Sequence, residues 1–181
     1  MNQEKIKLFK KKNAVFFDRD GVLNVDYGYV HKKQDFVWIK GAIKTIKYLK
    51  ELGYILIVIT NQSGVSRGFY TEKEVIELHN WMNKELSKQI KIVIDDFFFA
   101  TELPDEKNIN SRRKPSPLMI NEAIKKHNIC RNNSFLIGDK DSDLWAAKNA
   151  KIKGFLFEGN DLFDSIQKIL KKIKSNRSNI K

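Results

Sequence analysis

The chain has 181 residues, of which 41% are hydrophobic and 31% charged, a composition typical of a globular protein that buries its own core. No apolar run approaches the ~18 residues of a membrane-spanning helix, and the basic segment 1–13 lacks the apolar centre of a secretory signal. The single cysteine excludes an internal disulfide, which suits a reducing compartment. We therefore expect a cytoplasmic protein with no membrane partner.

The formal net charge of +12 permits two interpretations. Either a phosphate-bearing partner binds the chain, or lysine serves as a general surface residue in a sequence rich in Lys, Asn and Ile. Many lysines stand at spaced positions on predicted helix faces, and the dense clusters 10–12 and 168–181 lie near the termini. These positions favour the second interpretation, so we expect no nucleic-acid partner.

Apolar runs predict five strands, at 13–17, 54–59, 92–99, 134–137 and 154–157. Periodic apolar residues predict helices at about 41–52, 71–89, 117–127 and 142–150, and a last helix that starts at Asp161 or Asp164. Thr71 and Glu74 form a capping box, and Ser116 is expected to cap the helix that opens with Pro117.

Strands that alternate with helices in this way predict an α/β fold, with a parallel sheet of about five strands and helices on both faces. The sequence shows no internal repeat and no second core. We expect one domain over residues 1–181, with a core at about 13–158 and a C-terminal helix and basic tail at about 161–181.

Two carboxylates follow the first predicted strand directly. The apolar residues 14–17 end in Asp18 and Asp20, and Gly21 comes next. Because burying an unpaired charge is costly, these acids belong at the exit of the strand rather than inside it. In an open α/β sheet this exit is where ligands bind, and a glycine allows a sharp turn there.

Other polar groups follow the neighbouring strands or precede a helix, and all of these positions share one edge of a parallel sheet. They comprise a hydroxyl and an amide, fixed cations, and further acids: Thr60, Asn61, Arg113, Lys114, Asp139, Lys140 and Asp143. Carboxylates can hold a metal, while cations and a hydroxyl can neutralise phosphoryl oxygens. A free carboxylate can act as a nucleophile. The pattern predicts a magnesium-dependent site for phosphoryl chemistry.

Four motifs in this order resemble the haloacid dehalogenase superfamily of phosphotransferases. They are FFDRDGVLN at 16–24, VITNQSG at 58–64, RRKPSP at 112–117 and LIGDKDSD at 136–143. Together with DYGYVH at 26–31 and TNQSGVSRG at 60–68, they resemble the branch of D-glycero-D-manno-heptose 1,7-bisphosphate phosphatases and related histidinol phosphatases. The resemblance covers about residues 13–158 and implies the Rossmann-like fold of that superfamily.

The resemblance also implies a role for each matching position. Asp18 would be the nucleophile that forms an aspartyl-phosphate, and Asp20 the acid and base. Mg²⁺ would bind the Asp18 carboxylate, the Asp20 backbone carbonyl and Asp139. Substrate contacts would come from the two loops and the cations at the same edge: Asp26, Tyr27, Gly28, Tyr29, Thr60, Asn61, Gln62, Ser63, Arg113, Lys114 and Lys140. Of these, Thr60 and Lys114 would hold the transferred phosphoryl group.

Three residues have competing interpretations. Asp143 is expected to orient Lys140 or the metal shell, although the two side chains could also form a solvated ion pair at a helix start. His79, among apolar neighbours on a predicted helix, is expected to be structural. His31 follows the predicted substrate loop, and either contacts the pocket or lies outside it.

Many members of this branch carry a zinc site, built from three Cys and one His, in the loop before RKP. The corresponding loop here, 101–112, contains neither residue type, so we expect no zinc. No insert is large enough for a separate cap domain, so the segments 21–40 and 100–113 are expected to close the site.

The resulting prediction is an enzyme that removes the C7 phosphate from D-glycero-D-manno-heptose 1,7-bisphosphate, a small phosphorylated sugar, and that acts as a monomer. Two alternative substrates within the superfamily remain open, histidinol phosphate and the 3′-phosphate of a nucleic-acid end. A non-catalytic sugar-phosphate binding module is the third alternative, and the complete set of acids argues against it.

Overall fold

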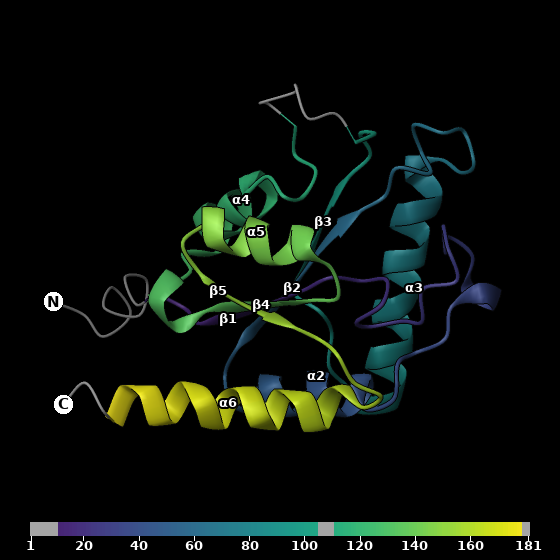
Figure 1. Cartoon of the computed structure of the whole chain (residues 1–181). Coiled ribbons are helices and arrows are strands. Elements are labelled where there is room, and N and C mark those ends of the chain that lie inside the picture. Colours follow the sequence, from purple (N-terminus) through teal and green to yellow (C-terminus); the bar gives the residue numbers. More distant parts are fainter. Residues whose placement is uncertain (1–10, 105–110, 179–181) are drawn as a thin grey trace, which may run out of the picture.

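The computed structural model describes residues 11–104 and 111–178. Its five strands are β1 (Ala14–Phe17), β2 (Ile55–Asn61), β3 (Asp96–Ala100), β4 (Phe135–Gly138) and β5 (Lys153–Leu156). They form one parallel sheet in the order β3-β2-β1-β4-β5, with β1 at its centre (Figure 1). The predicted α/β fold is confirmed.

Helices cover both faces of the sheet (Figure 1). One layer contains α2 (Ala42–Glu51), α3 (Glu72–Ile90) and α6 (Leu162–Ser178), and the other contains α4 (Leu118–His127) and α5 (Asp141–Asn149). Two short 3₁₀ helices, Lys33–Asp35 and Arg131–Asn133, lie in connections. No helix in the described ranges has the length and apolar character needed to cross a membrane.

Strand β1 divides its side chains between two hydrophobic cores because successive side chains of a strand point to opposite faces. Val15 and Phe17 join the core beneath α2, α3 and α6, whereas Ala14 and Phe16 join the core beneath α4 and α5. All four are fully buried. Phe17 pairs in register with Val58 of β2 and with Ile137 of β4, so the exits of these three strands lie side by side.

Strand β3 starts at Asp96, so the predicted start at residue 92 is wrong. The Asp95 N–H still donates to the Leu56 carbonyl of β2 at 2.9 Å, but Ile94 places its backbone hydrogen bonds elsewhere. Asn83 of α3 accepts from the Ile94 N–H at 2.9 Å and donates to the Ile94 carbonyl at 3.0 Å. This side chain therefore takes the place of a neighbouring strand for the segment before β3.

Two helix starts were predicted with different success. Thr71 and Glu74 form the expected capping box at the start of α3. Helix α4 begins one residue later than expected, with Pro117 as the capping residue, and Ser116 Oγ accepts from the Leu118 N–H at 3.3 Å. In the described residues, the segments from β1 to α2 and from β2 to α3 hold only one 3₁₀ helix, so no separate cap domain is inserted there.

Candidate active site

A polar cavity of about 240 Å³ lies at the carboxyl edge of the sheet. Twelve of the fourteen predicted site residues line it, and they are Asp18, Asp20, Asp26, Gly28, Tyr29, Thr60, Asn61, Gln62, Ser63, Arg113, Lys114 and Lys140. Tyr70 and Ser142 line it as well, and the sequence analysis did not identify them. The topology thus brings residues from four separate segments to one place.

The two remaining predicted residues lie differently. Asp139 does not line the cavity, but one of its carboxylate oxygens lies within 4.8 Å of carboxylate oxygens of Asp18 and Asp143. Tyr27 is 66% exposed and lies in a separate groove with His31 and Phe69. His31 stacks on Tyr70 and does not line the polar cavity, so of its two interpretations the structure supports the one without pocket contact.

Lys114 is the central cation of the site and is almost fully buried. Its Nζ lies 2.9 Å from Asp18 Oδ1 and 2.5 Å from Asp143 Oδ1, and it donates to the Ile59 carbonyl at 2.9 Å. Asn61 holds the Lys114 backbone from both sides, accepting from its N–H at 2.9 Å and donating to its carbonyl at 3.1 Å. The amide of Asn61 therefore places Lys114 between the two acids.

Asp143 is fully buried, so the alternative of a solvated ion pair with Lys140 is wrong. Its Oδ2 accepts from the Lys140 backbone N–H at 3.1 Å, while its Oδ1 faces the ammonium group of Lys114. Gly138 makes this position possible, because a Cβ there would lie 2.1 Å from Asp143 Cβ. Asp143 thus orients the backbone of Lys140 and the side chain of Lys114.

Burial is the largest influence on the pKa values of Asp18 and Asp139. It raises the pKa of Asp18 to about 7, even though Lys114 and the hydrogen bond from its ammonium group act in the opposite direction. Burial likewise raises the pKa of Asp139. Burial alone would lower the pKa of Lys114, but Asp18 and Asp143 raise it, so this lysine stays charged. The acids of the site therefore hold protons more readily than exposed carboxyl groups do, while Lys114 keeps its positive charge.

Asp18, Asp139 and Asp143 each offer one carboxylate oxygen, and these oxygens all lie within 4.8 Å of one another. Asp139 Oδ1 is buried and has no hydrogen-bond partner. A buried acceptor without a partner is costly, and a hard divalent cation with oxygen ligands would satisfy it. Gly21 (φ +85°) permits the approach, because a Cβ there would lie 2.3 Å from Asp139 Oδ2. The donor set fits Mg²⁺.

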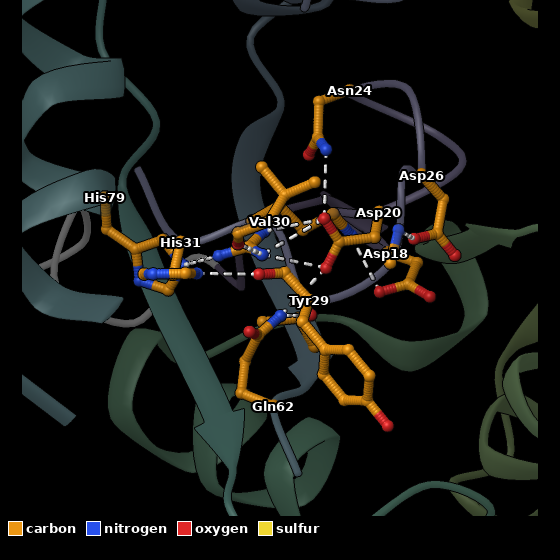
Figure 2. Close-up of polar contacts among 12 residues, drawn as sticks. Asp18, Asp20, Asn24, Asp26, Tyr29, Val30, His31, Gln62 and His79 are labelled. Carbon is orange, nitrogen blue, oxygen red and sulfur yellow. Dashed lines mark hydrogen bonds and ion pairs between the residues drawn. The ribbon is translucent and has the colours of Figure 1, made fainter. Parts of the chain in front are cut away.

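Asp20 also lines the cavity, and both of its carboxylate oxygens are hydrogen-bonded. Asn24 Nδ2 donates to Oδ1 and Gln62 Nε2 donates to Oδ2, each at 2.9 Å (Figure 2). Gln62 is itself held by the Tyr70 hydroxyl, which donates to its Oε1 at 2.7 Å. Gln62 Nε2 also donates to Thr60 Oγ1 at 2.9 Å, which places the predicted phosphoryl-binding hydroxyl next to Asp20.

Charged groups surround the mouth of the cavity. Lys140 Nζ donates to Asp26 Oδ2 at 3.2 Å, which joins the loop after β1 to the exit of β4. Arg113 donates to the Glu102 carbonyl at 3.3 Å, and burial together with the nearby Arg67 lowers its pKa. Part of the loop on which the zinc prediction rests, residues 105–110, lies outside the described residues.

Comparison with known proteins agrees with this geometry. The polynucleotide kinase 3 phosphatase family model matches residues 13–155. The D-glycero-beta-D-manno-heptose-1,7-bisphosphate 7-phosphatase of Helicobacter pylori (strain ATCC 700392 / 26695) is 45% identical over 143 residues, covering 79% of this chain and 82% of the relative. The D-glycero-alpha-D-manno-heptose-1,7-bisphosphate 7-phosphatase of Photorhabdus laumondii is 40% identical over 148 residues, covering 78% of this chain and 80% of the relative.

A solved structure gives the same result. D,D-heptose 1.7-bisphosphate phosphatase from B. bronchiseptica, complexed with magnesium and phosphate, matches with a TM-score of 0.76 and 26% identity, over 88% of this chain and 99% of that chain. The fold, the acid pair after the central strand and the buried lysine define a phosphatase of the haloacid dehalogenase superfamily. Within that class, the chain belongs to the D-glycero-D-manno-heptose-1,7-bisphosphate 7-phosphatase family. The predicted resemblance is confirmed.

Proposed function

We propose that this chain hydrolyses the C7 phosphate of D-glycero-D-manno-heptose 1,7-bisphosphate through an aspartyl-phosphate on Asp18. The observation that carries the proposal is the position of Asp18, whose carboxylate lies 2.9 Å from the Lys114 ammonium group at the floor of a polar cavity. The choice of substrate follows the relatives that are 40–45% identical.

In the first step, a carboxylate oxygen of Asp18 attacks the phosphorus atom and the bond from phosphorus to the C7 oxygen breaks. Asp20 gives its proton to that oxygen, which leaves as a hydroxyl. In the second step, Asp20 takes a proton from water as the water attacks the phosphorus atom of the aspartyl-phosphate. The bond from phosphorus to the Asp18 oxygen breaks, which frees inorganic phosphate and restores the Asp18 carboxylate. Lys114 and Thr60 donate to the phosphoryl oxygens in both steps.

The residues that would hold Mg²⁺ are Asp18, Asp139 and the Asp20 backbone carbonyl, with Asp143 adjoining them. When bound, the cation offsets the charge of the phosphoryl group and of the carboxylates around it. The mouth of the cavity supplies cations for the second phosphate of a bisphosphate, namely Arg113 and Lys140. Asp26, Tyr29, Gln62 and Ser63 would contact the sugar.

We also propose that the chain acts as a single-domain monomer in the cytoplasm. One continuous sheet with a core on each face supports the single domain. The predicted catalytic residues Asp18 and Asp20 line one cavity together with Thr60 and Lys114, which supports a site formed within one chain. Size-exclusion chromatography with light scattering tests the oligomeric state, and a dimer at working concentration would contradict this proposal.

The test is phosphate release in Mg²⁺ from a panel of substrates: both anomers of the heptose bisphosphate, histidinol phosphate, and a 3′-phosphorylated oligonucleotide. ³¹P NMR of the sugar product shows which phosphate has left. We expect one heptose anomer to be hydrolysed fastest, with its C1 phosphate retained.

The matched control variants are Asp18→Asn and Asp164→Asn. Asp164 is exposed in the first turn of α6, so its variant should retain full activity, whereas Asp18→Asn should be inactive. Faster turnover of the oligonucleotide would favour the function in the description of the matching family model. Faster turnover of histidinol phosphate would change the substrate and leave the mechanism in place.

A further inference from the structure

Arg19 stands between the two acids Asp18 and Asp20 and has no exposed surface at all. A buried guanidinium is costly unless it is paired and hydrogen-bonded, because it loses its hydration. In the alternation of β1, Arg19 follows Val15 and Phe17 and enters the core on the α3 side of the sheet. Its partners there explain why a charge is kept in this position.

The Arg19 guanidinium bonds to three separate parts of the chain. Nη2 donates to both oxygens of the Asp20 carboxylate, at 3.0 Å and 2.8 Å, and Nε adds a contact of 3.3 Å to Oδ1. The same Nη2 donates to the Val30 carbonyl at 2.5 Å. Nη1 lies 3.4 Å from His79 Nε2, in α3.

His79 acts as an acceptor toward Arg19, since a guanidinium can only donate. Burial and the neighbouring Arg19 lower the pKa of His79 well below its usual 6.5, so the ring stays neutral. Asp20 is therefore the counter-ion of Arg19, and within residues 11–104 and 111–178 it is the only carboxylate bonded to the guanidinium group.

The bonds around Asp20 restrict its rotation. Asn24 and Gln62 supply one donor to each of its oxygens, and Arg19 supplies the two-point contact that sets the plane of the carboxylate. Because Nη2 also holds Val30, the position of this carboxylate depends on the loop that carries Asp26 and the other residues at the cavity mouth.

We propose that Arg19 is a positioning residue, which orients the Asp20 carboxylate for proton transfer and couples it to the substrate loop through Val30. The proposal rests on the proposed function of Asp20 as acid and base. Arg19 itself does not line the cavity. Its effect on the reaction must therefore pass through Asp20 and the loop.

A choice of leaving group separates this role from a purely structural one. A sugar alkoxide must be protonated as it leaves, whereas p-nitrophenolate leaves without a proton, so only the first needs Asp20 as an acid. With p-nitrophenyl phosphate, the rapid first release of p-nitrophenol reports the phosphorylation of Asp18, and the later steady rate reports hydrolysis of the aspartyl-phosphate.

The experiment compares wild type, Arg19→Lys, Asp20→Asn and the double variant in Mg²⁺. A lysine keeps the charge but cannot contact Asp20, Val30 and His79 together. For Arg19→Lys we expect kcat on the sugar phosphate to fall roughly tenfold to hundredfold, as for a misplaced catalytic group, with an increased KM. The initial burst of p-nitrophenol should be unchanged, and in the Asp20→Asn background Arg19→Lys should cause no further loss in kcat.

The matched control is Arg131→Lys, on the opposite face of the sheet. Arg131 is half-buried and donates to Asn121 at 2.9 Å and to the Ala150 carbonyl, away from the site. This variant should keep the activity of wild type. Circular dichroism and the thermal midpoint check folding, and Arg19→Gln is the second variant. If both Arg19 variants fail to fold where Arg131→Lys folds, Arg19 is structural and the proposal is wrong.

Two kinetic results would also overturn the proposal. One is that Arg19→Lys reduces the p-nitrophenol burst as much as it reduces kcat on the sugar phosphate. The other is that Arg19→Lys reduces kcat in the Asp20→Asn variant by the same factor as in wild type. An error in the proposed heptose substrate would not be confused with either result, because the comparison of the four proteins can use any alkyl phosphate that the wild type hydrolyses.

Discussion

Lys114→Met removes the only cation within bonding distance of two buried acids in the described site. Asp18 and Asp143 would then lose their counter-charge, while Asp139, within 4.8 Å of both, keeps its ion pair with Lys140. Removing one partner of a buried ion pair costs about 3–5 kcal/mol of unfolding free energy, because the other charge is left buried and unpaired. For a chain of this size that corresponds to about 6–20 °C in the melting midpoint.

The assay is thermal unfolding followed by far-UV circular dichroism in EDTA, with Lys73→Met as the control. Lys73 is 85% exposed and lies 3.8 Å from Glu77, and an exposed pair of this kind contributes only about 0.3–0.5 kcal/mol. Added Mg²⁺ should narrow the gap between Lys114→Met and wild type, because a cation replaces part of the lost charge. If Lys114→Met melts within the shift seen for Lys73→Met, Lys114 does not hold the acids as described.

Two further predictions concern the metal site and the dependence of stability on pH. Gly21→Ala would place a Cβ 2.3 Å from Asp139 Oδ2 at a φ of +85°, so the Mg²⁺ concentration for half-maximal activity should rise, and an unchanged value would contradict the Mg²⁺ site. His79 has a pKa well below 6.5 in the folded chain, so the unfolded chain takes up a proton first and stability falls as pH drops below about 6.5. Urea unfolding at successive pH values measures the free energy of unfolding, and in His79→Gln the part of its decrease that comes from His79 should be absent. The same dependence of unfolding free energy on pH in wild type and His79→Gln would refute this prediction.

Most of the site could be predicted from the sequence because of one geometric property of parallel sheets. Parallel strands end at the same edge, so the polar residues after β1, β2 and β4 had to meet once the strands were identified. Asp18, Thr60 and Asp139 each follow a short apolar run that is easily seen. Their approach also needs β2 and β4 to flank β1, a strand order that the sequence did not predict and that the structure provides.

Arg19 and Asp143 were harder to interpret, since both look like surface charges in the sequence. The alternation of β1 does contain a signal for Arg19, because Val15, Phe17 and Arg19 share one face of the strand. If the alternation of side chains continues two residues past Phe17, it predicts the Arg19 guanidinium in the core beside α3. For Asp143, the partner Lys114 is distant in sequence and on a different segment, so no local pattern connects them.

The start of β3 shows a second limit. The residues 92–94 are apolar and β-branched, and their composition favours a strand. The backbone N–H and carbonyl of Ile94 bond instead to the side chain of Asn83 in α3. Such a contact between a side chain and a distant backbone depends on tertiary packing, which hydrophobic periodicity does not describe.

The most direct test of the central claim is capture of the covalent intermediate. Enzyme is mixed with D-glycero-D-manno-heptose 1,7-bisphosphate and Mg²⁺, quenched in acid within a single turnover and digested for mass spectrometry. The account predicts one phosphoryl group on the peptide that contains Asp18, and none in Asp18→Asn. Turnover without a phosphorylated peptide, or with the phosphoryl group on another residue, would contradict it.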